Sequence, residues 1–313
     1  MAFQPLLDCW YLTGPTASGK SSVAVELARL IGAEIVSMDS MALYRRMDIG
    51  TAKPTQADRR SVPHHLIDII DPHEEFSLAQ YIEAAHRCVG DISGRGKTTL
   101  FVGGTPLYLK GLLRGIFQGP PADWDFRRQL LREAQLQDRC WLHRRVEEVD
   151  AAAAAKLHPN DTRRLIRALE IFHLTGRPIS ELQRQFDAGA AADRCRVFVL
   201  DRPRKELHAR IDRRVDEMFE NGLIAEVQTL LADANPPGKT ARQAVGYREV
   251  IEHLDGRRDA SETVEFVKLH TRQLAKRQCT WFRSLSECRF MPLSENIDPA
   301  AVAGQILEAA SGR

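Results

Sequence analysis

The sequence has few of the features that place a chain in a membrane, in an oxidising compartment or around a zinc ion. No hydrophobic run among its 313 residues approaches the length that crosses a bilayer, and the N-terminus lacks the basic segment of a secretory signal. The six cysteines form no C-x-x-C pair and no cysteine–histidine cluster at zinc spacing. We therefore expect a cytoplasmic protein with reduced, buried thiols and no membrane partner.

The sequence also has little net charge. Its 44 Lys and Arg residues nearly balance 42 Asp and Glu residues, which gives +2. This balance neither favours nor excludes a nucleic-acid partner, so any basic surface must be local. A hydrophobic content of 43% over 313 residues allows a sizeable core in one large or two ordinary domains.

A glycine loop near the N-terminus carries the strongest motif. Gly14 to Ser21 matches the phosphate-loop pattern G-x-x-x-x-G-K-[ST], between an apolar run at 9–12 and apolar residues at helical spacing over 22–30. Glycines let backbone N–H groups surround one anion, and the dipole of the following helix reinforces the attraction. The sequence predicts phosphate binding by Gly14, Pro15, Thr16, Ala17, Ser18 and Gly19, with Lys20 on the outer phosphate and Ser21 on Mg²⁺.

Strands and helices alternate after this loop. Strand-like segments occupy residues 33–38, 63–70, 98–102 and 194–200. An amphipathic helix runs from Ser77 to about Val89. The alternation predicts an α/β fold with a P-loop NTPase-like parallel sheet. Asp39 ends the second strand, so it either enters the crevice where such sheets bind ligands or caps the next turn.

The strand at 98–102 does not end as it would in a hydrolytic P-loop enzyme. Such enzymes usually place an acidic residue there to help hold Mg²⁺. This chain instead continues with Gly103, Gly104, Thr105 and Pro106. The glycines allow close approach to a ligand, and Thr105 offers a hydroxyl.

A helical segment then interrupts the α/β pattern. Beyond residue 119 the sequence reads as helix to about Phe186, with Pro159 and Pro178 as breaks. We predict an all-helical insertion domain at 120–189 within a core formed by 1–119 and 190–313.

Three groups of cations suit an anionic ligand. Arg163 and Arg167 lie four residues apart on one face of a helix in the insert. A later helix carries arginines that could close over a phosphate, namely Arg210, Arg213 and Arg214. The segment 266–286 has no acidic residue, and its cations are Lys268, Arg272, Lys276, Arg277 and Arg283. For the first and third groups, the alternative is that the cations bind no ligand and only form a solvated helix face.

Together these motifs resemble the tRNA dimethylallyltransferases, also called tRNA isopentenyltransferases. The resemblance covers nearly the whole chain and rests on residues 14–21, 39–40, 47–54, 64–68, 103–108, 163–170, 246–247 and 271–281. The zinc finger of eukaryotic relatives is absent, which indicates the bacterial type. Two positions depart from the family: Ala42 stands where Gln is frequent, and Pro106 stands where Gly is frequent.

The resemblance implies transfer of a dimethylallyl group from dimethylallyl diphosphate to N6 of the adenosine 3′-adjacent to the anticodon, with release of diphosphate. The phosphate loop would then hold a leaving group, and no hydrolytic water has to be positioned. Asp39 would accept the amine proton and Thr105 would hydrogen-bond at the reaction centre. Lys20, Arg214 and Mg²⁺ would stabilise the diphosphate. The target base would leave its stack, as in base flipping.

The resemblance also implies which residues contact the anticodon stem-loop of tRNA. They are Asp39, Ser40, Met41, Ala42, Thr105, Arg127, Arg163, Arg164, Leu165, Ile166, Arg167, Thr240, Ala241, Arg242, Gln243, Ala244 and Val245. We expect a monomer with Mg²⁺ as its cofactor. ATP can also occupy the loop, since such a nest recognises phosphates, but transfer should not require it.

Three other functions stay open on the sequence alone. A small-molecule kinase shares the loop and the arginine-rich helix, and it would turn over ATP. An adenylate isopentenyltransferase shares the chemistry but has little use for a helical insert. A non-catalytic RNA-binding module explains the basic segment, yet it does not explain why Asp39 and a complete phosphate loop meet at one crevice.

Overall fold

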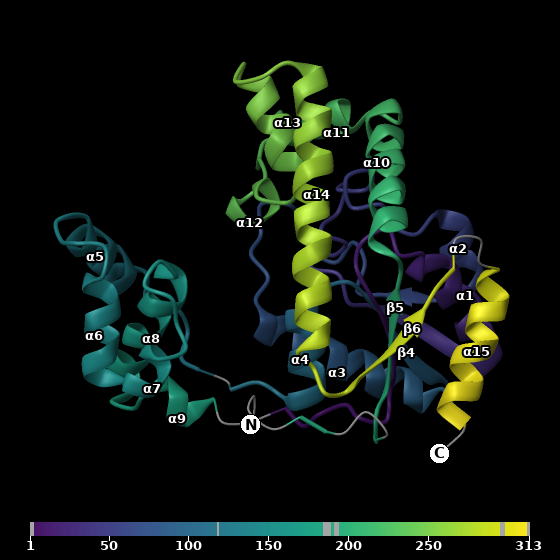
Figure 1. Cartoon of the computed structure of the whole chain (residues 1–313), viewed down its shortest axis with the longest axis horizontal. Helices are drawn as coiled ribbons and strands as arrows, with labels where there is room; N and C mark the ends of the chain where they lie inside the picture. The colour runs from purple at the N-terminus through teal and green to yellow at the C-terminus, as the bar shows by residue number, and fades with distance from the viewer. Residues whose placement is uncertain (1–2, 118, 184–188, 191–193, 295–297, 312–313) are drawn as a thin grey trace. The chain divides into compact units, whose positions relative to one another are not determined.

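The computed structural model describes residues 3–117, 119–183, 189–190, 194–294 and 298–311 (Figure 1). The chain forms two compact units. One combines Pro5–Leu113 with Gly189–Arg313, and the other combines Met1–Gln4 with Arg114–Ala188. The helical unit thus begins at Arg114, six residues before the predicted start at residue 120. Gly115 approaches the Phe3 carbonyl closely within this unit. Among the described residues, no helix is long and apolar enough to span a bilayer.

A six-stranded parallel sheet forms the centre of the first unit. Its strands are β1 (Trp10–Thr13), β2 (Ala33–Ser37), β3 (His64–His65), β4 (Thr98–Gly103), β5 (Arg196–Asp201) and β6 (Cys288–Pro292). They lie in the order β3-β2-β4-β1-β5-β6. The predicted α/β fold is confirmed. Because every pair is parallel, the carboxyl ends of β1, β2, β4 and β5 meet at one edge of the sheet.

The helices of this unit cover the sheet and extend beyond its carboxyl edge. They are α1 (Lys20–Ile31), α2 (Gln56–Ser61), α3 (Leu78–Gly94), α4 (Pro106–Arg114), α10 (Arg204–Glu220), α11 (Leu223–Leu231), α12 (Lys239–Arg242), α13 (Tyr247–Leu254), α14 (Ala260–Arg283) and α15 (Pro299–Ser311). Figure 1 shows α15 beside α1, and long α14 beside α10. The sequence reasoning predicted neither β6 nor α15.

The two faces of the sheet bury different residues, because successive side chains of a strand point to opposite sides. Leu12 packs with Leu27 of α1 and Ile306 of α15. The neighbouring Tyr11 stacks on Phe101 of β4, with ring centroids 5.1 Å apart. Right-handed crossovers place α1 and α3 on opposite faces, since one connects β1 to β2 and the other returns from β3 to β4.

The helical unit has a core of its own. Its helices are α5 (Trp124–Gln135), α6 (Trp141–Val149), α7 (Ala151–Ala154), α8 (Thr162–Thr175) and α9 (Ile179–Leu182). The core includes Leu130, Leu142, Val146, Leu165 and Leu169. The sequence predicted helix to about Phe186, but the last described helix ends at Leu182, and residues 184–188 lie outside the described residues.

A buried carboxylate holds α5 to α8. Glu170 is fully buried and accepts two hydrogen bonds of 2.7 Å from Arg127, one of 2.5 Å from Arg167 and one from the backbone N–H of Asp123. Burial alone raises the pKa of Glu170, but these hydrogen bonds outweigh it and leave the pKa below its ordinary value.

Three local predictions were wrong. The strand expected at 63–70 ends at His65, because Leu66 and Asp68 adopt left-handed φ angles of 56° and 58°. The Pro-Pro-Gly composition at 236–238 predicts a loop over 236–243, but residues Lys239–Arg242 form the helical turn α12. Cys140 is exposed, although the thiols were expected to be buried.

Replacing Glu170 by Gln should weaken the helical unit. A neutral amide would leave two partly buried guanidinium groups without their counter-charge, at a cost of about 2–3 kcal/mol. Since the folded pKa of Glu170 is lowered, its contribution is present above the unfolded pKa and is lost as pH falls through the folded value. Hydrogen exchange of α5 and α8 measures the effect. Glu181→Gln, which removes only an exposed carboxylate 3.7 Å from Arg177, is the control and should change exchange little.

Candidate active site

The phosphate loop joins β1 to α1 in a conformation that exposes backbone N–H groups. Gly14 and Gly19 have φ angles of 146° and 97°, and Ala17 lies in the left-handed region at 62°. A side chain at Gly14 would approach the Leu200 carbonyl to 2.8 Å, so the close contact with β5 requires glycine. No side chain caps α1 and its first turn contains no acidic residue. The positive end of this helix is therefore available to an anion.

Three arginines at the end of β5 and along α10 hold consecutive residues of this loop. Arg202 donates from Nε to the Ser18 carbonyl at 2.9 Å, and Arg210 donates from Nε to the Ala17 carbonyl at 2.9 Å. Arg214 donates to the Thr16 hydroxyl at 3.3 Å and to the Thr51 carbonyl at 3.4 Å. The sequence indicated the α10 arginines as phosphate ligands. It did not reveal that they also brace the loop.

Lys20 lies under the loop, where its Nζ donates to the carbonyls of Gly14 at 3.0 Å and Pro15 at 2.7 Å. Burial, reinforced by the positive charge of Arg214, lowers the pKa of Lys20 to about 7. Burial also lowers the pKa of Arg214. An anion that enters the site would relieve both effects, because it compensates the buried positive charge.

The end of β2 and the turn after β4 form the opposite wall. A Cβ at Gly103 would overlap the backbone of Met38 at 2.1 Å, so only glycine allows this contact. The Thr105 hydroxyl consequently accepts the Ser40 N–H at 3.1 Å. Asp39 uses Oδ1 to accept the Met41 N–H at 2.8 Å, so it stabilises the turn while also facing the cavity. Pro106 begins α4, where a backbone N–H is not required.

The segment at 47–53 forms part of the wall and is fixed from two sides. Glu226 of α11 accepts the backbone N–H groups of residues 48–50 and the Tyr247 hydroxyl. Buried Lys53 bridges Asp48 at 2.7 Å and Asp68 at 2.6 Å. A Cβ at Gly50 would meet the Tyr247 ring at 2.4 Å. The residues at 47–54 and 246–247 that carry the resemblance are thus in contact.

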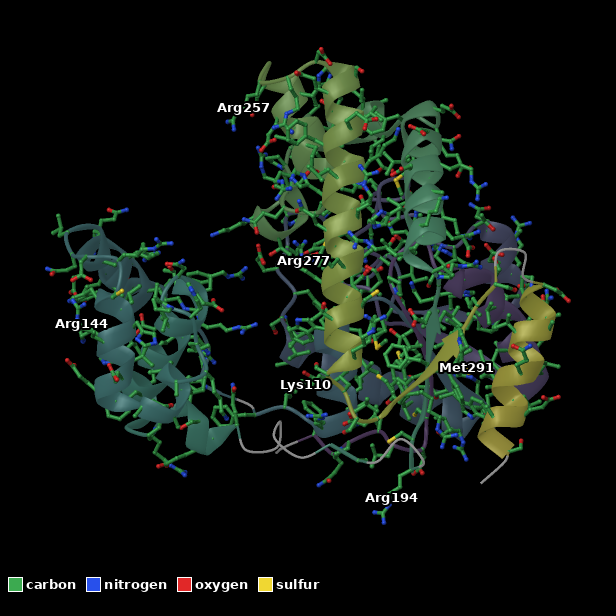
Figure 2. The ribbon with its side chains drawn as sticks, in the orientation of Figure 1. Lys110, Arg144, Arg194, Arg257, Arg277 and Met291 are labelled. Carbon is green, nitrogen blue, oxygen red and sulfur yellow. The ribbon has the colours of Figure 1, made fainter. Side chains whose placement is uncertain are left out.

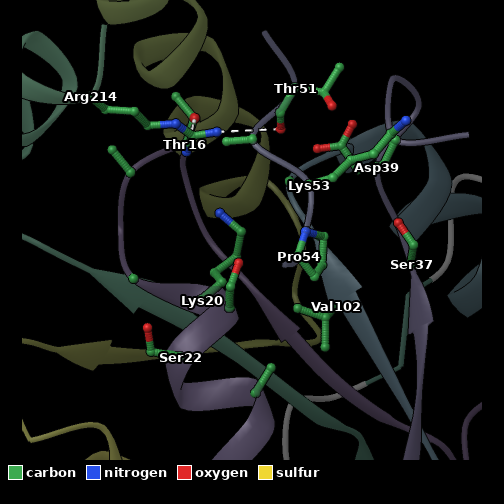
Figure 3. A pocket seen from close by; sticks show the side chains of 18 of the residues that line it. Thr16, Lys20, Ser22, Ser37, Asp39, Thr51, Lys53, Pro54, Val102 and Arg214 are labelled. Atoms are coloured by element: carbon green, nitrogen blue, oxygen red, sulfur yellow. Dashed lines mark hydrogen bonds between the residues drawn. The ribbon is translucent and has the colours of Figure 1, made fainter. Parts of the chain in front are cut away.

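These elements enclose a cavity of about 610 Å³ within the α/β unit (Figure 3). Figure 3 shows Lys20 and Arg214 on one side and Asp39 across from them. The carboxylates among the described lining residues are Asp39 and Glu217. Mg²⁺ prefers oxygen donors and keeps several waters, and the exposed Ser21 hydroxyl together with a phosphate fits that chemistry. In the described part of the chain, no cluster of three His, Cys, Asp or Glu side chains is arranged to hold a metal.

The residues expected to contact tRNA differ in accessibility. Leu165, Ile166, Ala241 and Ala244 are buried, so their side chains serve the core. Ala42 is also buried, but it lines the cavity. In the helical unit, Arg127 and Arg167 bind Glu170, while Arg163 and Arg164 are exposed. Thr240 hydrogen-bonds Glu75 through its hydroxyl, and Arg242 and Gln243 are exposed beside it.

The basic segment of α14 is partly neutralised by α10. Lys268 pairs with Asp216 at 2.8 Å, and Arg272 pairs with Asp212 at 3.0 Å. Lys276 and Arg277 are exposed and form no ion pair within the described chain; Arg277 is labelled on α14 in Figure 2. Of the basic segment predicted at 266–286, only the C-terminal part around Lys276 and Arg277 therefore keeps positive charge that no ion pair of the described chain neutralises.

Comparison with known proteins agrees with this geometry. The family model described as IPP transferase matches residues 42–285, and that described as isopentenyl transferase matches residues 7–68. The chain belongs to the IPP transferase family. It is 51% identical to a tRNA dimethylallyltransferase of Rhodopirellula baltica, over 92% of this chain and 89% of that protein. It is 48% identical to one of Geobacter metallireducens, over 88% and 89%.

Solved structures of the IPP transferase family share the fold. A tRNA isopentenylpyrophosphate transferase from Bacillus halodurans matches with a TM-score of 0.68 and 36% identity, over 96% of this chain and 97% of that one. A eukaryotic dimethylallyltransferase described as acting on tRNA matches with a TM-score of 0.74 and 27% identity, over 91% and 73%.

Diphosphate binding should be coupled to proton uptake at Lys20. Since the free-site pKa is about 7 and a diphosphate would keep Lys20 charged, affinity should fall as pH rises above 7, by up to about tenfold per unit. Calorimetry with inorganic pyrophosphate, in buffers of different ionisation enthalpy, measures the uptake: about half a proton at pH 7 and nearly one at pH 8.

The matched control is Lys20→Arg, because arginine stays charged throughout this range. Calorimetry with this variant measures the proton uptake that comes from pyrophosphate alone. Identical proton uptake by the parent and Lys20→Arg would contradict the pKa assigned to Lys20.

Proposed function

We propose that this member of the IPP transferase family transfers a dimethylallyl group from dimethylallyl diphosphate to N6 of the adenosine 3′-adjacent to the anticodon of tRNA. The main observation is a single cavity in which the phosphate loop and its cations face Asp39. Thr105 does not line this cavity but lies next to Asp39, because its hydroxyl accepts the Ser40 N–H. The names of the relatives support the substrate assignment. The proposal extends to a monomer that acts in the cytoplasm; the monomer is supported by the cavity, whose described lining comes from one chain.

The cations of the cavity act on the leaving group. When the allylic C–O bond breaks, negative charge grows on the diphosphate. Lys20, Arg214 and the N–H groups at the start of α1 stabilise this charge in the reactive geometry. Mg²⁺ held by Ser21 and the phosphates would supply further charge neutralisation when bound.

The opposite wall acts on the acceptor. N6 of adenosine forms a bond to the allylic carbon as the carbon–oxygen bond breaks, and N6 then loses a proton. We assign the acceptance of that proton to Asp39, which lines the cavity and whose Oδ1 accepts the Met41 N–H. Thr105, held by Ser40, hydrogen-bonds at the reaction centre.

The direct test is incubation with an unmodified anticodon stem-loop, dimethylallyl diphosphate and Mg²⁺, followed by nucleoside mass analysis. We expect N6-dimethylallyladenosine and free diphosphate without added ATP. Prenylation of free adenylate but not of RNA would indicate a nucleotide-directed transferase. A phosphorylated product that requires ATP would indicate a kinase, and binding of RNA without any product would indicate a non-catalytic module.

Asp39→Asn should separate catalysis from binding. The amide oxygen can still accept the Met41 N–H, but it is far less basic than a carboxylate. The single-turnover rate should fall by about 10²-fold, equivalent to about 2.7 kcal/mol of barrier. Pyrophosphate affinity should change less than about threefold. A single-turnover rate equal to that of the parent would show that Asp39 does not accept the proton.

Among the arginines of the helical unit expected to contact tRNA, Arg163 and Arg164 are the two that are exposed. Replacing both by Ala should raise KM for tRNA and reduce the slope of log affinity against log salt by up to about two. Affinity for dimethylallyl diphosphate should not change. The control replaces Arg144 and Arg177, two exposed arginines of the same unit. An equal effect of the control pair on tRNA binding would contradict a specific role for Arg163 and Arg164.

A further inference from the structure

One buried amide connects the two walls of the cavity. Gln278 of α14 accepts the Thr16 N–H of the phosphate loop through Oε1 at 2.9 Å. Its Nε2 donates to the Gly104 carbonyl, in the turn after β4, at 2.6 Å. Because an N–H can only donate and a carbonyl can only accept, the two partners fix the orientation of the amide. Gln278 is 8% exposed and lines the cavity.

The same connection continues to the acceptor wall. Gly104 precedes Thr105, whose backbone N–H donates to the Met38 carbonyl at 3.2 Å and whose hydroxyl accepts the Ser40 N–H. Met38 and Ser40 flank Asp39. A short series of hydrogen bonds therefore joins Thr16 of the phosphate loop to the backbone that carries Asp39.

The turn after β4 leaves room for the side-chain amide of Gln278. A Cβ at Gly104 would lie 2.7 Å from Nε2 of Gln278 and 3.4 Å from the Gly14 carbonyl. A side chain there would push the amide out of its place. Glycine at 104 and glutamine at 278 therefore depend on each other, although 174 residues separate them.

We propose that Gln278 is a positioning residue that sets the separation between the phosphate loop and the Gly103–Thr105 turn, and hence between the leaving group and the acceptor amine. This inference rests on the proposed transfer function. Gln278 acts through Thr16 and Gly104 and leaves the charges around the diphosphate unchanged. Its loss should therefore reduce kcat more than it weakens the binding of either substrate, because misplacement by about 1 Å can cost roughly 10²-fold in rate.

The first experiment compares the full-length parent with Gln278→Met, which keeps a similar volume without either hydrogen bond. We expect the single-turnover transfer rate at saturating substrates to fall 10–100-fold, by the same misplacement argument. The dissociation constants for inorganic pyrophosphate and for the anticodon stem-loop should change less than about threefold. Hydrogen exchange of the loop peptide at 13–19 should become faster, because the Thr16 N–H loses its acceptor.

The second experiment tests the coupling to Gly104. Gly104→Ala displaces the amide from the other side, so its effect on the rate should not add to that of Gln278→Met. The double variant should be about as slow as the slower single variant. The control is Gln228→Met, since Gln228 lies exposed on α11 and outside the cavity; its rate should match that of the parent.

Three results would overturn the proposal. A Gln278→Met rate within threefold of the parent would leave the amide a structural role only. A loss of pyrophosphate affinity as large as the loss of rate would make Gln278 a ligand of the phosphates. Additive effects in the double variant would show that Gln278 and Gly104 act separately. If the parent itself transfers no dimethylallyl group, the proposed function fails instead, and the binding and exchange data still test the bridge.

Discussion

The site depends on buried positive charge that lacks a counter-ion. Lys20, Arg210 and Arg214 surround the phosphate loop, and none of them forms an ion pair within 4 Å in the described chain. Each donates to neutral oxygens instead, and burial lowers the pKa of all three. An entering diphosphate supplies the missing charge, so binding is strongest for the most highly charged form of the ligand. Hydrogen bonds of Arg202, Glu226 and Gln278 fix the phosphate loop and the cavity walls around these cations.

Much of the fold and the donor half of the site could be predicted from local sequence. The phosphate-loop pattern, the capping box at Ser77 and Gln80, and the alternation of strands each depend on residues close in the chain. Asp39 and Thr105 could be assigned to one crevice because parallel strands end at the same edge of a sheet. Asp39 lines the cavity, and Thr105 lies beside it through its hydrogen bond with the Ser40 N–H. The glycines at 50, 103 and 104 also indicated a close approach of the backbone to another group, but the sequence could not show which residues they contact.

What could not be predicted depends on contacts between distant segments. The segment 266–286 looked strongly basic because Asp212 and Asp216, which neutralise part of it, belong to α10. Arg127 and Arg167 looked available for RNA because nothing local shows that Glu170, three residues beyond Arg167, is fully buried between them. Helical spacing places residues on one face, but it does not say which other helix covers that face.

The turn after β4 shows how the core differs from one built for nucleotide hydrolysis. An acidic residue at this strand end would help to hold Mg²⁺ for attack by water. Gly103 instead lets the turn lie directly on Met38, so Thr105 reaches Ser40 and Gln278 reaches Gly104. In the proposed reaction, the position that usually serves a metal would serve the alignment of an acceptor. Glycine in place of the acidic residue suits the attack of an uncharged amine on carbon. That reaction depends more on the distance and angle between two organic groups than on the activation of a water molecule.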